Sequence, residues 1–303
     1  MFESRTRISE NEMKIVIIGA GGRLGGALMR EYRDKFEILG FDHEQLHLSN
    51  EKEVEDWLTP LDFNALVNAA AFTNVDRCEM ERDRAFAINA EAPRILAKIC
   101  RSKKAKLIHF STDYVFDGEK RDPYTEKDSA NPISVYAESK REGERLVLQT
   151  DERHLVVRVS WIFGPDRPSF VDEIIKRARE EEHVDAVADK FSTPTYTRDV
   201  AEMLPQVFDS DLAGGILHFA NAGECSWQEY GQFALDCCRS LGIPLKATRV
   251  GAIKLADMKN WVARRPIYSV LCTEKFFSFT GTTPRNWRDA VAEYVRGHYA
   301  GLD

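Results

Sequence analysis

The stretch Lys14-Ile-Val-Ile-Ile18, followed by Gly19-Ala-Gly21-Gly22-Arg23-Leu24-Gly25, decides the fold. The apolar run predicts a buried strand, and the glycines in GxxGxxG spacing predict a tight turn into a helix. Glycines let the backbone approach a pyrophosphate, whose charge is stabilised by the free N–H groups and dipole of a helix N-terminus. Asp42 ends the next predicted strand, where a carboxylate can accept hydrogen bonds from an adenosine ribose. The stretch therefore predicts a dinucleotide site.

Apolar runs alternate with helical patterns through the first half of the chain, which is typical of βαβ units around a parallel sheet. Further strands are expected at 36–41, 65–68, 106–110, 155–159 and 216–220. Helices are expected at 50–58, 84–102 and 170–181, and at starts near 135, 197 and 226. We expect an α/β fold, a Rossmann-type doubly wound parallel sheet with a smaller α/β substrate-binding domain. Its parts would be an N-terminal extension (1–12), a dinucleotide-binding domain (13–160), and a mainly substrate-binding domain interleaved with the last sheet elements (161–303).

The composition excludes several classes of protein. Hydrophobic residues make up 43% of the chain and charged residues 30%, and no run approaches the ~18 apolar residues of a membrane span. The polar N-terminus lacks the apolar core of a secretory signal, so we expect a cytoplasmic protein with its six cysteines reduced and mostly buried. A net charge of -7 argues against nucleic acid as a partner. A homodimer is left open.

A second motif, Tyr136-Ala-Glu-Ser-Lys140, falls at a predicted helix start. Its spacing puts the phenol and the ammonium on one helical face, where a cation would lower the phenol's pKa from about 10. The spacing is common by chance, and an exposed pair on an amphipathic helix would share it. Here, however, Ser111-Thr112-Asp113 ends the fourth predicted strand, at the edge of the sheet where ligands bind in this architecture.

These motifs occur with others in a specific order. The others are Asn68-Ala-Ala-Ala-Phe-Thr-Asn-Val-Asp76, Ser111-Thr-Asp-Tyr-Val-Phe-Asp-Gly118, Val159-Ser-Trp161, Phe191-Ser-Thr-Pro-Thr-Tyr196, Ala263-Arg-Arg-Pro266 and Trp287. Together they resemble the dTDP-4-dehydrorhamnose reductases, extended short-chain dehydrogenases that catalyse the last step of dTDP-L-rhamnose synthesis. The resemblance spans nearly the whole chain.

The resemblance implies an NADH- or NADPH-dependent enzyme that reduces the C4 keto group of a dTDP-4-keto-6-deoxy sugar. Thr112, Tyr136 and Lys140 would be catalytic: the tyrosine protonates the C4 oxygen, the lysine lowers the phenol's pKa and holds the nicotinamide ribose, and the threonine orients the carbonyl. Thr112, Asp113 and Trp161 would contact the sugar nucleotide. The implied cofactor residues are Gly19, Gly21, Gly22, Arg23, Leu24, Gly25, Asp42, His47, Leu48, Ala71, Phe72, Thr73, Tyr136 and Lys140.

Other functions remain as alternatives. Related 4,6-dehydratases place Asp-Glu after the threonine, whereas Asp113-Tyr114 follows here, which favours reduction. The regulatory subunit of methionine adenosyltransferase resembles these reductases but binds a partner without catalysis, and typically has Ser where this chain has Thr112. A reductase of another 4-keto sugar nucleotide is a third alternative. Departures from the family pattern at Ser169, Ser192 and 267–268 lie in the substrate half and leave the sugar open.

Two local signals concern metal and cofactor choice. His43-Glu44-Gln-Leu-His47 matches the zinc motif HExxH, which requires a helix and a third ligand. The segment directly follows a strand end, so we interpret the match as coincidence and expect no metal. Asp42 repels a 2′-phosphate and favours NADH, whereas Arg23 could pair with that phosphate and favour NADPH.

Overall fold

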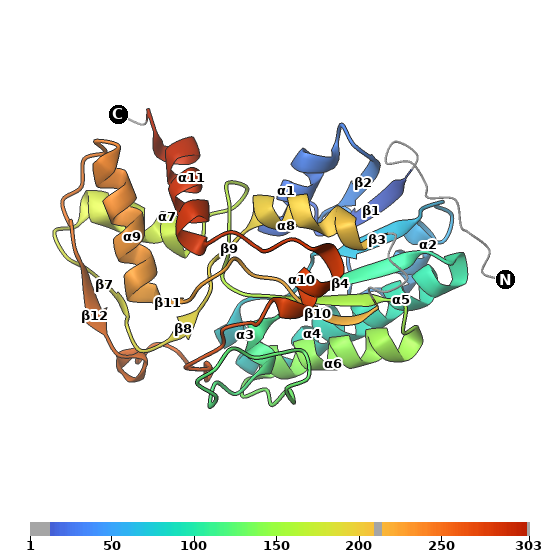
Figure 1. Ribbon diagram of the computed structural model, residues 1–303. Helices are drawn as coiled ribbons and strands as arrows, with labels where there is room; N and C mark the ends of the chain where they lie inside the picture. The colour runs from blue at the N-terminus through green and yellow to red at the C-terminus, as the bar shows by residue number, and fades with distance from the viewer. Residues whose placement is uncertain (1–12, 209–213, 302–303) are drawn as a thin grey trace.

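A six-stranded parallel sheet lies in the centre of the computed structural model, which describes residues 13–208 and 214–301 (Figure 1). The predicted extension 1–12 lies outside the described residues. The strand order is β10-β5-β4-β3-β1-β2, so the order reverses between β1 and β3, as in a doubly wound fold. The strands are β1 (Lys14–Ile18), β2 (Glu37–Phe41), β3 (Ala65–Asn68), β4 (Lys106–Thr112), β5 (Leu155–Val159) and β10 (Gly215–His218).

The prediction that every strand is buried on both faces is wrong for β2. This strand is the edge of the sheet, and its burial alternates, with Glu37 and Leu39 exposed. An edge strand has a neighbour on one side only, so its apolar sequence does not require cover on both faces. Strand β4 extends two residues beyond its predicted end, through Thr112.

Helices cover both faces of the sheet (Figure 1). Apolar side chains of α1 (Arg23–Tyr32), α8 (Thr197–Met203) and α10 (Glu274–Thr280) pack on one face. Those of α2 (Glu51–Leu58), α5 (Ala92–Lys103) and α6 (Val135–Thr150) pack on the other. This two-sided cover explains the continuous apolar runs of the central strands.

The single helix predicted for 84–102 is three segments. They are α4 (Arg82–Phe86), a π-helical turn η2 (Ala87–Glu91) and α5, which has a proline in its first turn. The short helix α3 (Val75–Met80) precedes them. A π-turn is a single i→i+5 turn between α-helical segments, and the apolar spacing of the sequence did not reveal it.

The second lobe, at the left of Figure 1, packs around its own core. Its helices are α7 (Phe170–Glu180), α9 (Trp227–Ser240) and α11 (Trp287–Tyr299). Three separate two-stranded sheets accompany the central sheet: β6 (Ile162–Phe163) with β9 (Thr195–Tyr196), β7 (Val184–Val187) with β12 (Val250–Ile253), and β8 (Phe191–Ser192) with β11 (Cys225–Ser226). The 3-10 turns are η3 (Asp113–Val115), η4 (Leu204–Val207) and η5 (Leu255–Asp257).

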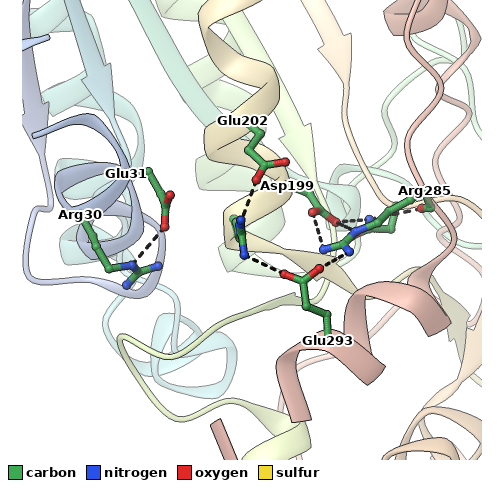
Figure 2. Close-up of polar contacts among 8 residues, drawn as sticks. Arg30, Glu31, Asp199, Glu202, Arg285 and Glu293 are labelled. Atoms are coloured by element: carbon green, nitrogen blue, oxygen red, sulfur yellow. Dashed lines mark hydrogen bonds and ion pairs between the residues drawn. The ribbon is translucent and has the colours of Figure 1, made fainter. Parts of the chain in front are cut away.

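An ionic network fixes the lobes to each other (Figure 2). Arg285 donates to Asp199 through Nε (2.9 Å) and Nη2 (2.7 Å), and its Nη1 lies 2.5 Å from Glu293. Arg198 of α8 also contacts Glu293 of α11, at 3.0 Å. The network therefore ties a helix on the sheet to a helix of the second lobe. Within the described residues, no helix is long and apolar enough to cross a membrane.

Candidate active site

A cleft of about 790 Å³ opens at the carboxyl ends of the central strands. It is lined by nearly all of the predicted site residues: Gly19, Gly21, Gly22, Arg23, Leu24, Asp42, His47, Leu48, Ala71, Phe72, Thr73, Thr112, Asp113, Tyr136, Lys140 and Trp161. Gly25 does not line the cleft. Its Cα lies against the turn, where an added Cβ would overlap the carbonyl oxygen of Gly19.

The glycine turn has the shape that a pyrophosphate needs. Gly19 adopts φ +85°, a left-handed conformation, and its N–H donates to the carbonyl of Phe41 at 2.8 Å. Gly22 is the N-cap of α1, and neither a side-chain cap nor an acidic residue occupies the first turn. The first N–H groups of α1 thus remain available for an anion, so this end of the cleft fits the phosphates of a dinucleotide.

Asp42 and Arg23 line the cleft beside the glycine turn. Oδ1 of Asp42 accepts hydrogen bonds from the backbone N–H groups of Glu44 (2.9 Å) and Gln45 (3.0 Å), which leaves Oδ2 for a ligand. Arg23 lines the cleft, and its guanidinium donates to the backbone carbonyls of residues 167 and 168. Its pairing with a 2′-phosphate stays a prediction.

The HExxH segment forms a turn and not a helix. His43 lies in that turn, and the ring of His47 contacts Glu53 through Nδ1 at 2.9 Å. Residues 13–208 and 214–301 contain no cluster of three or more His, Cys, Asp or Glu side chains suited to a metal. The two histidines of the motif are therefore not arranged as a helical zinc pair.

Tyr136 and Thr112 meet at the centre of the cleft. Tyr136 is the second residue of α6, whose N-cap Ser134 accepts from the N–H of Ala137, and Thr112 is the last residue of β4. Burial raises the pKa of the Tyr136 phenol, and a side-chain hydrogen bond with Thr112 acts in the opposite direction. The phenol therefore keeps its proton at neutral pH.

Lys140 lies one helical turn after Tyr136 and is buried. Its Nζ donates to the carbonyl of Phe110 at 2.7 Å and lies 3.5 Å from Nε2 of His109. Burial lowers the pKa of Lys140 to about 8, against the attraction of Glu144. The ammonium is directed to the backbone of β4, and burial dominates at the phenol. That Lys140 lowers the pKa of Tyr136 during the reaction stays a prediction.

Asp113 is buried beside Thr112 and accepts three hydroxyl hydrogen bonds. The donors are Thr112 to Oδ1 (3.2 Å), and Ser192 (3.1 Å) and Ser269 (2.5 Å) to Oδ2. Burial raises the pKa of Asp113, opposed mainly by the positive charge of Lys190 and then by these hydrogen bonds. Ser192, one of the departures from the family pattern, thus contacts a carboxylate that lines the cleft.

Trp161 and Lys190 form the wall behind that carboxylate. Trp161 adopts φ +39°, a strained conformation for a bulky residue. Nζ of Lys190 lies 4.9 Å from the ring centre of Tyr114 and 5.4 Å from that of Trp161. Within the described residues, neither Nζ of Lys190 nor Nε1 of Trp161 has a hydrogen-bond partner, and both atoms are buried.

A buried ion pair positions α6 against the sheet. Arg158 of β5 donates to both oxygens of Glu144, through Nε at 2.8 Å and Nη2 at 2.7 Å. Ser111 of β4 donates to the same carboxylate at 2.6 Å. The pair therefore sets the distance between the residue preceding Thr112 and the helix that carries Tyr136.

The π-turn places a second anchor, Asn89, against the predicted cofactor loop. Its Oδ1 accepts from the N–H of Phe72 (2.8 Å), and its Nδ2 donates to Oγ of Ser139 on α6 (3.0 Å). Sequence reasoning missed Asn89, the Glu144–Arg158 pair, Lys190 and Arg167. Each is an isolated polar residue in a helix or loop, without a motif that would distinguish it from a solvated one.

Comparison with known proteins places the whole chain in one family. Residues 13–299 match the family model described as RmlD substrate binding domain. A dTDP-4-dehydrorhamnose reductase of Mycolicibacterium smegmatis is 35% identical over 96% of this chain and 88% of its own. A probable dTDP-4,6-dihydroxy-2-methyloxan-3-one 4-ketoreductase of Streptomyces antibioticus is also 35% identical, over 93% of this chain and 94% of its own.

The fold is similar to solved structures as well. The crystal structure of dTDP-4-dehydrorhamnose reductase from Bacillus anthracis in complex with NADP superposes with a TM-score of 0.88. That protein is 30% identical, and the match covers 94% of this chain and 99% of its own. The Rossmann-type fold predicted from the sequence is therefore confirmed.

Proposed function

Because the chain belongs to the dTDP-4-dehydrorhamnose reductase family, we propose that it uses NADH or NADPH to reduce the C4 keto group of dTDP-4-dehydrorhamnose, which gives dTDP-L-rhamnose. The observation that carries the proposal is that Tyr136 and Thr112, the last residue of β4, line the same cleft as the glycine turn. A proton donor and a dinucleotide site in one cleft are what carbonyl reduction requires.

The cofactor, when bound, supplies the hydride. The glycine turn and the start of α1 would hold its phosphates, and Asp42 would accept hydrogen bonds from the adenosine ribose. Asn89 keeps the loop of Ala71, Phe72 and Thr73 at a fixed distance from α6. These groups bind and orient the reactant without taking part in bond breaking.

Tyr136 donates a proton to the C4 oxygen as negative charge develops there. The phenol carries its proton before the reaction, since burial raises its pKa above the ordinary value. Thr112, whose hydroxyl donates to Asp113, would orient the carbonyl. Lys140 lies one turn away and stabilises the phenolate that remains after proton transfer.

The sugar end of the cleft supports a polar, uncharged substrate group. Asp113 presents an acceptor held by two serines, and the N–H of Trp161 is an unpaired donor. A pair of one acceptor and one donor is suited to hexose hydroxyls. The alternative substrate is another dTDP-4-keto sugar, which the similarity to the Streptomyces ketoreductase favours.

The experiment is an absorbance assay at the nicotinamide band with NADH or NADPH and a panel of 4-keto sugar nucleotides. The proposal predicts oxidation of the cofactor with dTDP-4-dehydrorhamnose and formation of dTDP-L-rhamnose. If the protein reduces only a different 4-keto sugar nucleotide, that sugar nucleotide is its substrate. If it binds nucleotides but reduces no ketone, the result favours the non-catalytic alternative. We further infer that the enzyme is cytoplasmic. Whether it forms a homodimer would be tested by light scattering of the purified protein.

A further inference from the structure

A loop of the second lobe, residues 164–169, lies on the glycine turn and α1. Nη1 of Arg30 on α1 contacts Oδ1 of Asp166 at 2.5 Å. Asp166 approaches α1 so closely that a Cβ on Gly26 would lie 3.0 Å from the Cβ of the aspartate. This end of the loop is therefore fitted to α1 by both charge and shape.

The next two residues of the loop are held by a reciprocal pair of arginines. Nε of Arg23 donates to the carbonyl of Arg167 at 3.1 Å, and its Nη2 donates to the carbonyl of Pro168. In return, Nε of Arg167 donates to the carbonyl of Gly21 at 2.9 Å. Backbone and side chain of residue 167 are thus both fixed over the glycine turn.

The guanidinium of Arg167 keeps its two terminal nitrogens for a ligand. Only its Nε is used within the described residues, and the side chain lines the cleft. A Cβ built on Gly21 would lie 3.8 Å from Nη2 of Arg167 and 3.9 Å from Oδ2 of Asp42. Arg167 and Asp42 therefore lie on either side of the space next to Gly21, and they do not form an ion pair with each other.

We propose that Arg167 binds the 2′-phosphate of NADPH, and that it is the residue that lets this chain accept NADPH in the presence of Asp42. The inference rests on the proposed function. An aspartate at this position accepts from the ribose hydroxyls of NADH and repels a 2′-phosphate, whereas an arginine nearby accommodates that phosphate. Arg167 supplies the arginine from outside the dinucleotide-binding half of the chain.

The geometry suits a phosphate better than a ribose. A planar guanidinium with two free nitrogens offers a bidentate, charge-assisted contact to phosphate oxygens. Arg23 cannot do this in the same way, because it donates to two carbonyls and thereby holds the loop. The two arginines thus have different roles: Arg23 holds the backbone of residues 167 and 168, and Arg167 faces the ligand.

The test measures binding apart from turnover. Dissociation constants of NADPH and NADH would be measured by fluorescence titration for the wild type, Arg167→Met, Arg167→Lys and a control, Arg249→Met. Arg249 is an exposed arginine beside β12, so its loss changes net charge equally. Calorimetry with adenosine 2′,5′-bisphosphate and with 5′-AMP repeats the comparison without a nicotinamide.

Arg167→Met should raise the NADPH-to-NADH ratio of dissociation constants about tenfold to a hundredfold, the range of charge-assisted phosphate contacts. Arg167→Lys should restore part of the preference, and Arg249→Met should leave the ratio unchanged. An unchanged ratio in Arg167→Met, or an equal loss of both cofactors, overturns the inference. Failure of the proposed function is distinguishable, because then the wild type binds cofactors but reduces no ketone.

Discussion

The buried pair of Glu144 and Arg158 offers a quantitative test of how α6 is positioned. Both side chains are almost fully buried, and the contact is bidentate. Replacing Arg158 by Met would leave the carboxylate of Glu144 buried with hydrogen bonds only from Ser111 and with the more distant Arg141, at 3.4 Å. Replacing Glu144 by Met would leave the guanidinium unpaired beside neutral His218.

Each single replacement should lower the free energy of unfolding by about 3–5 kcal/mol, the cost of an uncompensated buried charge. The double replacement removes both charges and fills the space with apolar atoms, so it should cost less than either single change. A loss of 3 kcal/mol multiplies the unfolded population by roughly 150. The interaction term of the cycle should therefore be large and favourable.

Urea denaturation followed by tryptophan fluorescence would give the four free energies. Arg145→Met is the matched control, because Arg145 and Glu142 form an exposed pair on the same helix and should contribute less than about 1 kcal/mol. Single variants that lose no more than this control would refute the reasoning, as would strictly additive losses in the cycle.

Three further outcomes are expected. Gly143→Ala should cost at least ~1–3 kcal/mol in urea denaturation, because an added methyl overlaps the carbonyl of Asn89; an unchanged midpoint would contradict this packing. Burial lowers the pKa of both Lys140 and Lys190 to about 8 from 10.5, so above about pH 8 the folded state binds fewer protons than the unfolded state. The free energy of unfolding should therefore rise between about pH 8 and pH 10.5, by at most ~3 kcal/mol per lysine. In Lys190→Met this rise with pH should be smaller. The pKa of His218 falls to about 3, mainly through burial, so stability should decrease as pH falls below about 6.5, and less steeply in His218→Gln; identical slopes in the two proteins would exclude this histidine.

Much of the central fold could be predicted from the sequence. The bounds of β1, β3 and β5 agree with their apolar runs, because strands covered on both faces must be continuously apolar. Strand β2 shows the limit of such a prediction. An apolar run does not distinguish a central strand from an edge strand, since the order of the strands depends on contacts between residues far apart in the sequence. The π-turn was also missed, because no residue type or spacing in 87–91 distinguishes a π-helical turn from an α-helical one.

The cleft was predictable where backbone geometry restricts the residue type. Gly19 requires a left-handed conformation, and Gly25 has no room for a Cβ, so both carry a recognisable spacing. Lys190 and Arg167 have no such constraint. Their roles depend on which rings and carbonyls the second lobe brings beside the sheet, which the spacing of residues in the chain does not encode.

The central claim is that Tyr136 donates the proton during ketone reduction. The most direct measurement is a single-turnover reaction of dTDP-4-dehydrorhamnose with bound NADPH, followed at the nicotinamide band for the wild type and Tyr136→Phe. The account predicts a rate lower by about 10²–10⁴-fold in the variant, with the dissociation constant of NADPH unchanged. A variant that oxidises NADPH within about twofold of the wild-type rate would contradict it.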